Sequence, residues 1–118
     1  MLAAVAFVEL LYWDGCPSHP QALAELRAAL EDVGRPDVQV TVTEIVTEDD
    51  ALERGFIGSP TVLVGGVDVV AADELEPTRL TCRVYRRRDG RYAPTPDPLD
   101  LRDALRRLLP AAAEEARA

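Results

Sequence analysis

The sequence contains no lysine, so all 13 of its basic residues are arginines. Schiff-base catalysis by a lysine and the phosphate-binding lysine of a P-loop are therefore excluded. Cysteine and histidine are scarce, with two residues and one residue respectively. No segment reaches the roughly 18 consecutive apolar residues that indicate a membrane span. Chemistry through sulfur or imidazole is therefore confined to Cys16, His19 and Cys82.

The remaining composition is typical of one globular domain. The 118 residues are 47% hydrophobic and 29% charged, and the chain is long enough for one core and too short for two. The formal net charge of −8 disfavours nucleic acid and anionic membranes as partners, because both would repel the chain. We therefore expect residues 1–118 to form a single domain that binds neither.

The first residues and the two cysteines indicate the cellular compartment of the protein. Residues 1–13 are apolar but lack the basic start and the cleavage pattern of a secretion signal, so we interpret them as the first strand. Two cysteines far apart, without such a signal, predict a cytoplasmic protein. In that compartment a cysteine is more often catalytic, redox-active or structural than permanently bridged.

Hydrophobic periodicity predicts alternating strands and helices. The apolar run over residues 5–12 is typical of a central strand covered on both faces. From Ser18 to Val33 apolar residues recur with a period of 3.6, and Gly34 ends this helix. Residues 38–46 alternate apolar with polar side chains, which predicts a half-exposed strand near the sheet edge.

The second half of the chain carries clear turn and cap signals. Thr47 is placed to cap a short helix with an acidic first turn that ends at Gly55. Gly65-Gly66 predicts a hairpin turn, residues 71–79 a loop or short helix, and residues 80–93 an extra strand or hairpin. Asp97 and Pro98 open a last helix, and residues 111–118 are predicted to fray. The buried stripe of that helix is predicted to be Leu101, Ala104, Leu105 and Leu108.

The strongest candidate site is the junction of strand and helix at residues 13–20. If Cys16 caps the helix, its sulfur faces unpaired backbone N–H groups and the positive end of the helix dipole, which favour the thiolate. Alternatively, Ser18 is the cap of a Ser-x-x-Gln capping box that includes Gln21. Pro20 favours this second alternative, because a proline further inside the helix would remove a hydrogen bond. Cys16 would then lie in the loop before the helix.

The order of these elements and two motifs resemble the thioredoxin-like superfamily over residues 5–110. The resemblance implies an α/β thioredoxin-like fold, in which a central mixed sheet is flanked by helices. It also implies that Cys16 is the nucleophile, and that Pro60 of Ser59-Pro60-Thr61 is the cis-proline beside it that orients the substrate backbone. More narrowly, Cys-Pro-Ser-His at 16–19 and Cys-Arg-Val-Tyr at 82–85 resemble small thioredoxin-like proteins, some of which are labelled alkylmercury lyase.

The sequence departs from the thioredoxin pattern in two places. Trp13 lies three residues ahead of Cys16, whereas thioredoxins place a tryptophan immediately before the nucleophile. His19 replaces the second cysteine of the CxxC motif, so this motif cannot close a local disulfide. One helical turn from Cys16, His19 would stabilise a thiolate or donate a proton to a leaving thiol. Alternatively, it is an exposed residue of the first turn without a role.

Cys82 and Glu9 complete the set of candidate catalytic residues. Attack by Cys82 on a mixed disulfide at Cys16 would leave an intramolecular bridge, which requires their Cα atoms within about 7 Å. Alternatively, Cys82 is a buried small apolar residue that alternates with Leu80 and Val84. The resemblance implies that Glu9 is the buried acid that shuttles protons. Alternatively, Glu9 reaches solvent at a sheet edge.

The sequence thus predicts a thioredoxin-like thiol–disulfide oxidoreductase that uses Cys16, with Cys82 or an external thiol as resolving group. Its partner would be a small or protein thiol or disulfide, and we expect neither a cofactor nor a resident metal. A second hypothesis is a soft-metal or organomercurial-handling protein that uses Cys16, Cys82 and His19. A third is a non-catalytic interaction module. The oligomeric state is undetermined.

One cluster of positive charge stands out in this acidic chain. It would bind the carboxylates of a small thiol or an acidic partner, or it is simply a solvated hairpin. The cluster consists of Arg83, Arg86, Arg87, Arg88 and Arg91.

Overall fold

The structure is a computed structural model that describes residues 7–71 and 76–109. The elements in chain order are β1 (Val8–Tyr12), α1 (His19–Asp32), β2 (Val40–Glu44), α2 (Glu48–Arg54), β3 (Thr61–Val64), β4 (Val67–Asp68), β5 (Tyr85–Arg86), β6 (Tyr92–Ala93) and α3 (Pro98–Leu108).

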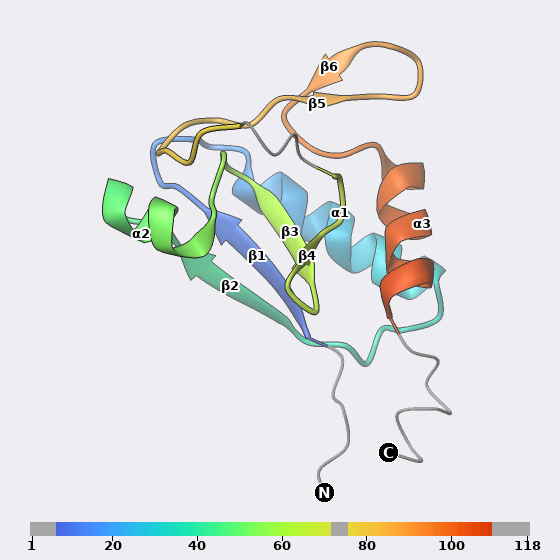
Figure 1. Ribbon diagram of the computed structural model, residues 1–118. Helices are drawn as coiled ribbons and strands as arrows, with labels where there is room; N and C mark the ends of the chain where they lie inside the picture. Colours follow the sequence, from blue (N-terminus) through green and yellow to red (C-terminus); the bar gives the residue numbers. More distant parts are fainter. Residues whose placement is uncertain (1–6, 72–75, 110–118) are drawn as a thin grey trace, which may run out of the picture.

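A four-stranded mixed sheet forms the centre of the protein, with the strand order β2-β1-β3-β4 (Figure 1). Strand β1 pairs in parallel with β2 and antiparallel with β3, and β3 continues antiparallel into β4. The expected central position of β1 and the edge position of β2 are both confirmed. Residues Val8 to Leu11 are buried, whereas every residue of β2 is at least partly accessible. The chain is therefore a mixed α/β protein with helices against its sheet.

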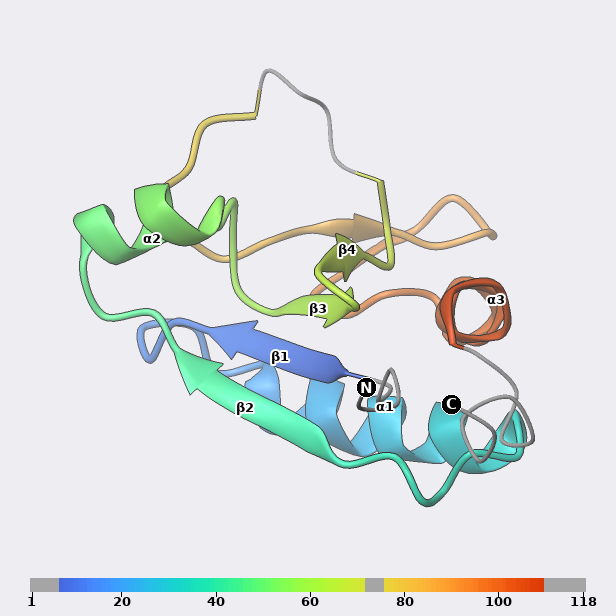
Figure 2. The ribbon, with the colours of Figure 1, turned by 60° about the horizontal axis from the view of Figure 1, so that its bottom comes forward.

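The helices cover the two faces of the sheet (Figure 2). Helices α1 and α3 pack against the face that carries Val8, Leu10 and Val62. On the other face, Leu11 of β1 packs with Phe56, next to the end of α2. Because side chains alternate along β1, this strand contributes residues to two hydrophobic cores, one on each face of the sheet. The larger core contains Val8, Leu10, Ala22, Leu26, Ala29, Leu30, Val62, Val64, Val69, Leu101, Ala104 and Leu105.

The local signals of the second half behave as predicted. Thr47 and Asp50 form a reciprocal capping box at the start of α2, which ends at Gly55. Gly65 and Gly66 join β3 to β4 with φ of 58° and 83°, the positive values that a type I′ turn requires. Asp97 caps α3 by accepting a hydrogen bond from the Leu99 N–H.

The predicted extra strand over residues 80–93 is only partly present. Tyr85–Arg86 pairs with Tyr92–Ala93 as a two-stranded ribbon around the Asp89-Gly90 turn. Residues 80–84 form no strand, and Cys82 makes an isolated bridge to Ser59 instead. The alternation of apolar and polar residues over 80–84 therefore does not produce a strand, because backbone pairing in this stretch is limited to the bridge between Cys82 and Ser59.

Two further predictions concern residues at the limits of the described chain. In α3, Leu101, Ala104 and Leu105 are buried as expected, and Leu108 is partly buried. The predicted fraying of residues 111–118 lies outside the described residues, as do residues 72–75 of the predicted loop. Within the described ranges, no helix combines the length and apolarity needed to cross a membrane.

Candidate functional site

At the junction between β1 and α1, the structure favours Ser18 over Cys16 as the residue that precedes the helix. Helix α1 begins at His19 with Ser18 as N-cap residue, so Cys16 lies in the preceding turn, where its N–H donates to the Trp13 carbonyl at 3.0 Å. The predicted capping-box bond from the Ser18 hydroxyl is wrong, because Ser18 makes no side-chain cap hydrogen bond. Its backbone has helical torsions (φ −85°, ψ −5°), whereas a capping residue is normally extended.

Cys16 and Cys82 form a disulfide, with their Cα atoms 5.5 Å apart. This separation lies in the range that disulfides normally span. Cys16 is buried, with only 2% of its surface accessible, whereas Cys82 is exposed. The alternative that Cys82 is a buried apolar residue is therefore wrong.

The backbone of Ser59 positions Cys82. The Ser59 N–H donates to the Thr81 carbonyl, and the Arg83 N–H donates to the Ser59 carbonyl, both at 2.8 Å. That carbonyl oxygen also lies 3.6 Å from the Cys16 sulfur. Ser59 is fully buried, its hydroxyl has no hydrogen-bond partner within the described ranges, and its bond to Pro60 is cis. Sequence reasoning missed this residue, whose only signal is its place before Pro60.

Arg83 and Tyr85 fasten the same segment to the sheet. The Arg83 guanidinium donates to Asp68 at 2.7 Å and to the Val70 carbonyl at 3.0 Å, and it lies 4.5 Å from the centre of the Tyr85 ring. The Tyr85 hydroxyl donates to the Pro60 carbonyl at 2.5 Å, and burial raises the pKa of this phenol. These contacts hold Cys82 in place independently of its sulfur.

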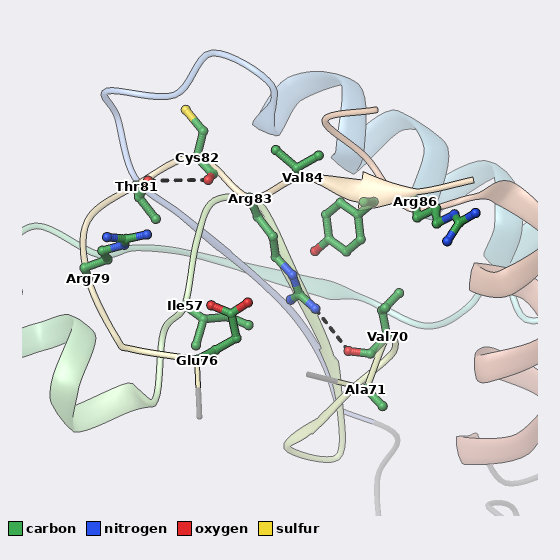
Figure 3. A pocket seen from close by; sticks show the side chains of 11 residues that line it. Ile57, Val70, Ala71, Glu76, Arg79, Thr81, Cys82, Arg83, Val84 and Arg86 are labelled. Carbon is green, nitrogen blue, oxygen red and sulfur yellow. Dashed lines mark hydrogen bonds between the residues drawn. The ribbon is translucent and has the colours of Figure 1, made fainter. Parts of the chain in front are cut away.

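A cavity of about 330 Å³ shows how the segment is oriented (Figure 3). Arg83 extends along this cavity toward Val70, whereas the Cys82 side chain points away from it at the rim. The Arg83 side chain is only 9% exposed. Arg83 therefore serves as an internal anchor rather than as a surface cation.

Gly58→Ala is expected to displace the segment that carries Cys82. A Cβ at this position would lie 2.8 Å from the Arg83 Cβ and 3.0 Å from its backbone, so the chain at Arg83 must move. We expect the fraction of Cys16–Cys82 disulfide in a glutathione buffer to fall severalfold, as measured by thiol alkylation and mass spectrometry.

Gly34→Ala provides the control for a general loss of stability. Gly34 has φ of 78° and open space around it, so alanine there costs about 1 kcal/mol of strain at the far end of α1. The disulfide equilibrium of this variant should match the wild type. If the disulfide equilibrium of Gly58→Ala also matches the wild type, the close approach of Gly58 to Arg83 does not determine the position of residues 81–83.

His19, at the start of α1, and Glu9, within β1, make contacts other than those predicted. The His19 ring is half-buried and stacks on Tyr12, with centroids 4.0 Å apart. The Glu9 carboxylate is buried and accepts hydrogen bonds from Thr43 at 2.7 Å and from Arg54 at 2.5 Å. The alternative of an exposed His19 is wrong, because its ring stacks on Tyr12. The alternative of a solvent-accessible Glu9 at a sheet edge is wrong, because β1 is central. Among the described residues, neither side chain has a hydrogen bond to a cysteine, so their predicted catalytic roles stay predictions.

The arginine cluster is largely neutralised by carboxylates of the chain itself. Arg88 pairs with Asp100 and Asp103, both at 2.7 Å. Arg86 alone in the cluster has no ion pair with another described residue. The remaining pairs are Arg83 with Asp68, Arg87 with Glu25 and Arg91 with Asp89.

A shallow groove of about 380 Å³ opens beside the disulfide. Both cysteines line it, together with residues of the 92–94 segment. For residues 7–71 and 76–109, no group of three or more His, Cys, Asp or Glu side chains is arranged to hold a metal ion. Within this part of the chain, the site therefore offers two sulfurs and an apolar groove.

Comparison with known proteins adds no family assignment. No protein-family model, curated protein or solved structure matches the chain.

Proposed function

We propose that the protein is a thioredoxin-like thiol–disulfide oxidoreductase whose Cys16–Cys82 pair cycles between disulfide and dithiol. The observation that carries this proposal is the position of Cys82, which hydrogen bonds to Ser59 place beside Cys16 from 66 residues away. A pair held in register by noncovalent contacts can open and close without rebuilding the fold. Such a pair suits repeated exchange with external thiols.

The reaction has two halves that balance in electrons. Two molecules of an external thiol reduce the protein disulfide, which yields the protein dithiol and one external disulfide. The dithiol then reduces a substrate disulfide, which yields two substrate thiols and restores the Cys16–Cys82 bond. Each half passes through a mixed disulfide on one cysteine. A second external thiol resolves it in the half that reduces the protein, and the other cysteine resolves it in the half that reduces the substrate.

The surroundings of Cys16 support the thiolate that this cycle needs. Cys16 lies two residues before the N-cap of α1, near the positive end of a 14-residue helix. Because the Ser18 hydroxyl does not cap the first turn, it leaves the N–H groups there free of this side-chain acceptor. A thiolate released at Cys16 is therefore favoured electrostatically.

The arrangement of elements also supports the thioredoxin-like assignment. A parallel β1-α1-β2 unit is followed by the antiparallel pair β3-β4 and a last helix, in the order that the resemblance implies. Ser59, the residue before Pro60, has its carbonyl oxygen 3.6 Å from the Cys16 sulfur. This nearness supports the expectation that Pro60 lies beside Cys16.

Turnover of a disulfide-bonded peptide, with dithiothreitol as the reductant, tests the proposal. We expect wild-type protein to accelerate the reaction, and Cys16→Ser and Cys82→Ser each to abolish the two-cysteine cycle. Ala28→Ser, which adds the same hydroxyl on the exposed side of α1, is the matched control and should retain full turnover. Unchanged turnover in either cysteine variant would contradict the proposed cycle, and a wild-type protein without activity would favour the interaction module.

A further inference from the structure

The two cysteines of the pair differ in accessibility. Cys16 has 2% of its surface exposed, whereas Cys82 is an exposed residue at the edge of the apolar groove. In Figure 3 the Cys82 side chain points away from the Arg83 cavity. An external molecule therefore meets Cys82 first.

The direction of attack reinforces this difference. In thiol–disulfide exchange, the attacking sulfur approaches one sulfur from the side opposite the sulfur that leaves. On the Cys16 side the protein interior is packed, with the Ser59 carbonyl oxygen 3.6 Å from the Cys16 sulfur. Cys82 is an exposed residue at the groove that both cysteines line.

The groove itself is apolar. Among the described residues that line it, only Arg83 is charged, and that guanidinium is engaged with Asp68 and the Val70 carbonyl. Val84 and Tyr92 are 66% and 72% exposed, so both offer apolar surface to a ligand. The net charge of −8 further disfavours anionic thiols. The other apolar residues that line the groove are Pro17, Ala93 and Pro94.

We propose that Cys82, rather than Cys16, is the sulfur that exchanges with external molecules, and that the groove beside it receives uncharged thiols and disulfides with an apolar group next to the sulfur. This inference rests on the proposed function and assigns the roles within the pair. It reverses the roles that the family resemblance implies for the two cysteines.

Each step of the exchange forms one disulfide bond and releases one thiolate, so the electrons balance. During reduction of the protein, an external thiolate bonds to the Cys82 sulfur, the Cys16–Cys82 bond breaks, and Cys16 leaves as a thiolate near the start of α1. A second external thiolate attacks the external sulfur of this mixed disulfide, releases the external disulfide and leaves the Cys82 thiolate. In the opposite half, the Cys82 thiolate attacks the substrate disulfide and releases one substrate thiol. Cys16 then attacks Cys82, re-forms the bridge and releases the second thiol.

Single-cysteine variants test which sulfur exchanges. Cys16→Ser and Cys82→Ser, checked for fold by circular dichroism, are treated with the neutral disulfide 4,4′-dithiodipyridine, and thiopyridone release is followed by absorbance. We expect Cys82 in Cys16→Ser to react at least about tenfold faster than Cys16 in Cys82→Ser, because access limits the buried thiol. Equal rates, or a faster Cys16, would overturn the proposal.

Reduced wild-type protein provides a second readout that needs no variant. Brief treatment with limiting N-ethylmaleimide, followed by peptide mass spectrometry, should label Cys82 before Cys16. Preferential labelling of Cys16 would contradict the assignment. This order of labelling does not depend on turnover. A protein without turnover would therefore refute the proposed function, whereas the labelling order alone decides which cysteine exchanges with external molecules.

Surface variants test the groove. Val84→Ser and Tyr92→Ser in the Cys16→Ser background should each slow the reaction with 4,4′-dithiodipyridine by about threefold to fivefold, because each removes apolar contact area. Their rates with anionic oxidised glutathione should change less than about twofold. Leu52→Ser, 70% exposed on α2, is the matched control and should leave both rates unchanged. Equal slowing of both disulfides would show that the groove does not select apolar groups.

Discussion

Reduction of the Cys16–Cys82 disulfide is expected to lower the free energy of unfolding by about 4 kcal/mol. The bond closes a loop between residues 66 positions apart, so it removes much of the conformational freedom of the unfolded chain. In the folded protein the segment keeps its hydrogen bonds to Ser59, so reduction acts mainly on the unfolded state. Urea unfolding with and without a phosphine reductant, followed by circular dichroism, measures the difference.

The control for this experiment is the double variant Cys16→Ser/Cys82→Ser. It should unfold near the midpoint of the reduced wild type and should not respond to the reductant. Coincident midpoints for the oxidised and reduced wild type would show that the bridge contributes no stability.

Replacement of Arg83 by methionine is expected to cost about 3 kcal/mol and to loosen Cys82. The Arg83 side chain is 9% exposed and Asp68 is 21% exposed, so loss of the cation leaves a largely buried carboxylate without its partner. The Val70 carbonyl loses its donor, and the Tyr85 ring loses the cation over its face. Urea unfolding of reduced protein isolates this cost from that of the disulfide.

Arg86→Met is the matched control for this prediction. Arg86 lies three residues further on, is exposed, and makes no ion pair with any residue that the structure describes. Its replacement should change stability by less than about 0.5 kcal/mol. The double variant Arg83→Met/Asp68→Leu should recover part of the loss, because it removes the unpaired charge. If Arg83→Met is as stable as Arg86→Met, Arg83 does not anchor the segment.

The local parts of the fold could be predicted because their signals lie within a few residues. The Thr47 capping box and the Gly65-Gly66 turn are determined by adjacent residues, whose backbone preferences need no distant partner. The central position of β1 followed from its continuous apolar character. Adjacent residues do not determine the start of α1, because Cys16 and Ser18 are competing caps within three residues.

The ion pairs at the candidate site could not be predicted in the same way. Glu9 meets Arg54 from 45 residues away, and Arg83 meets Asp68 across 15 residues and two separate segments. Sequence spacing gives the face on which such a side chain lies, but not which segment packs opposite. The arginines therefore looked like one surface patch, whereas three-dimensional packing assigns most of them to individual carboxylates.

The sequence by itself determined that chemistry through sulfur rests on Cys16 and Cys82, and that Cys16 lies where a strand meets a helix. Only the tertiary structure decided that Cys82 reaches Cys16, and that Cys82 is the exposed cysteine and Cys16 the buried one. The physical reason is that strand, turn and cap preferences act over a few neighbouring residues. The meeting of two cysteines 66 residues apart depends instead on backbone pairing with Ser59 and on the Arg83 anchor, which exist only once the sheet has formed.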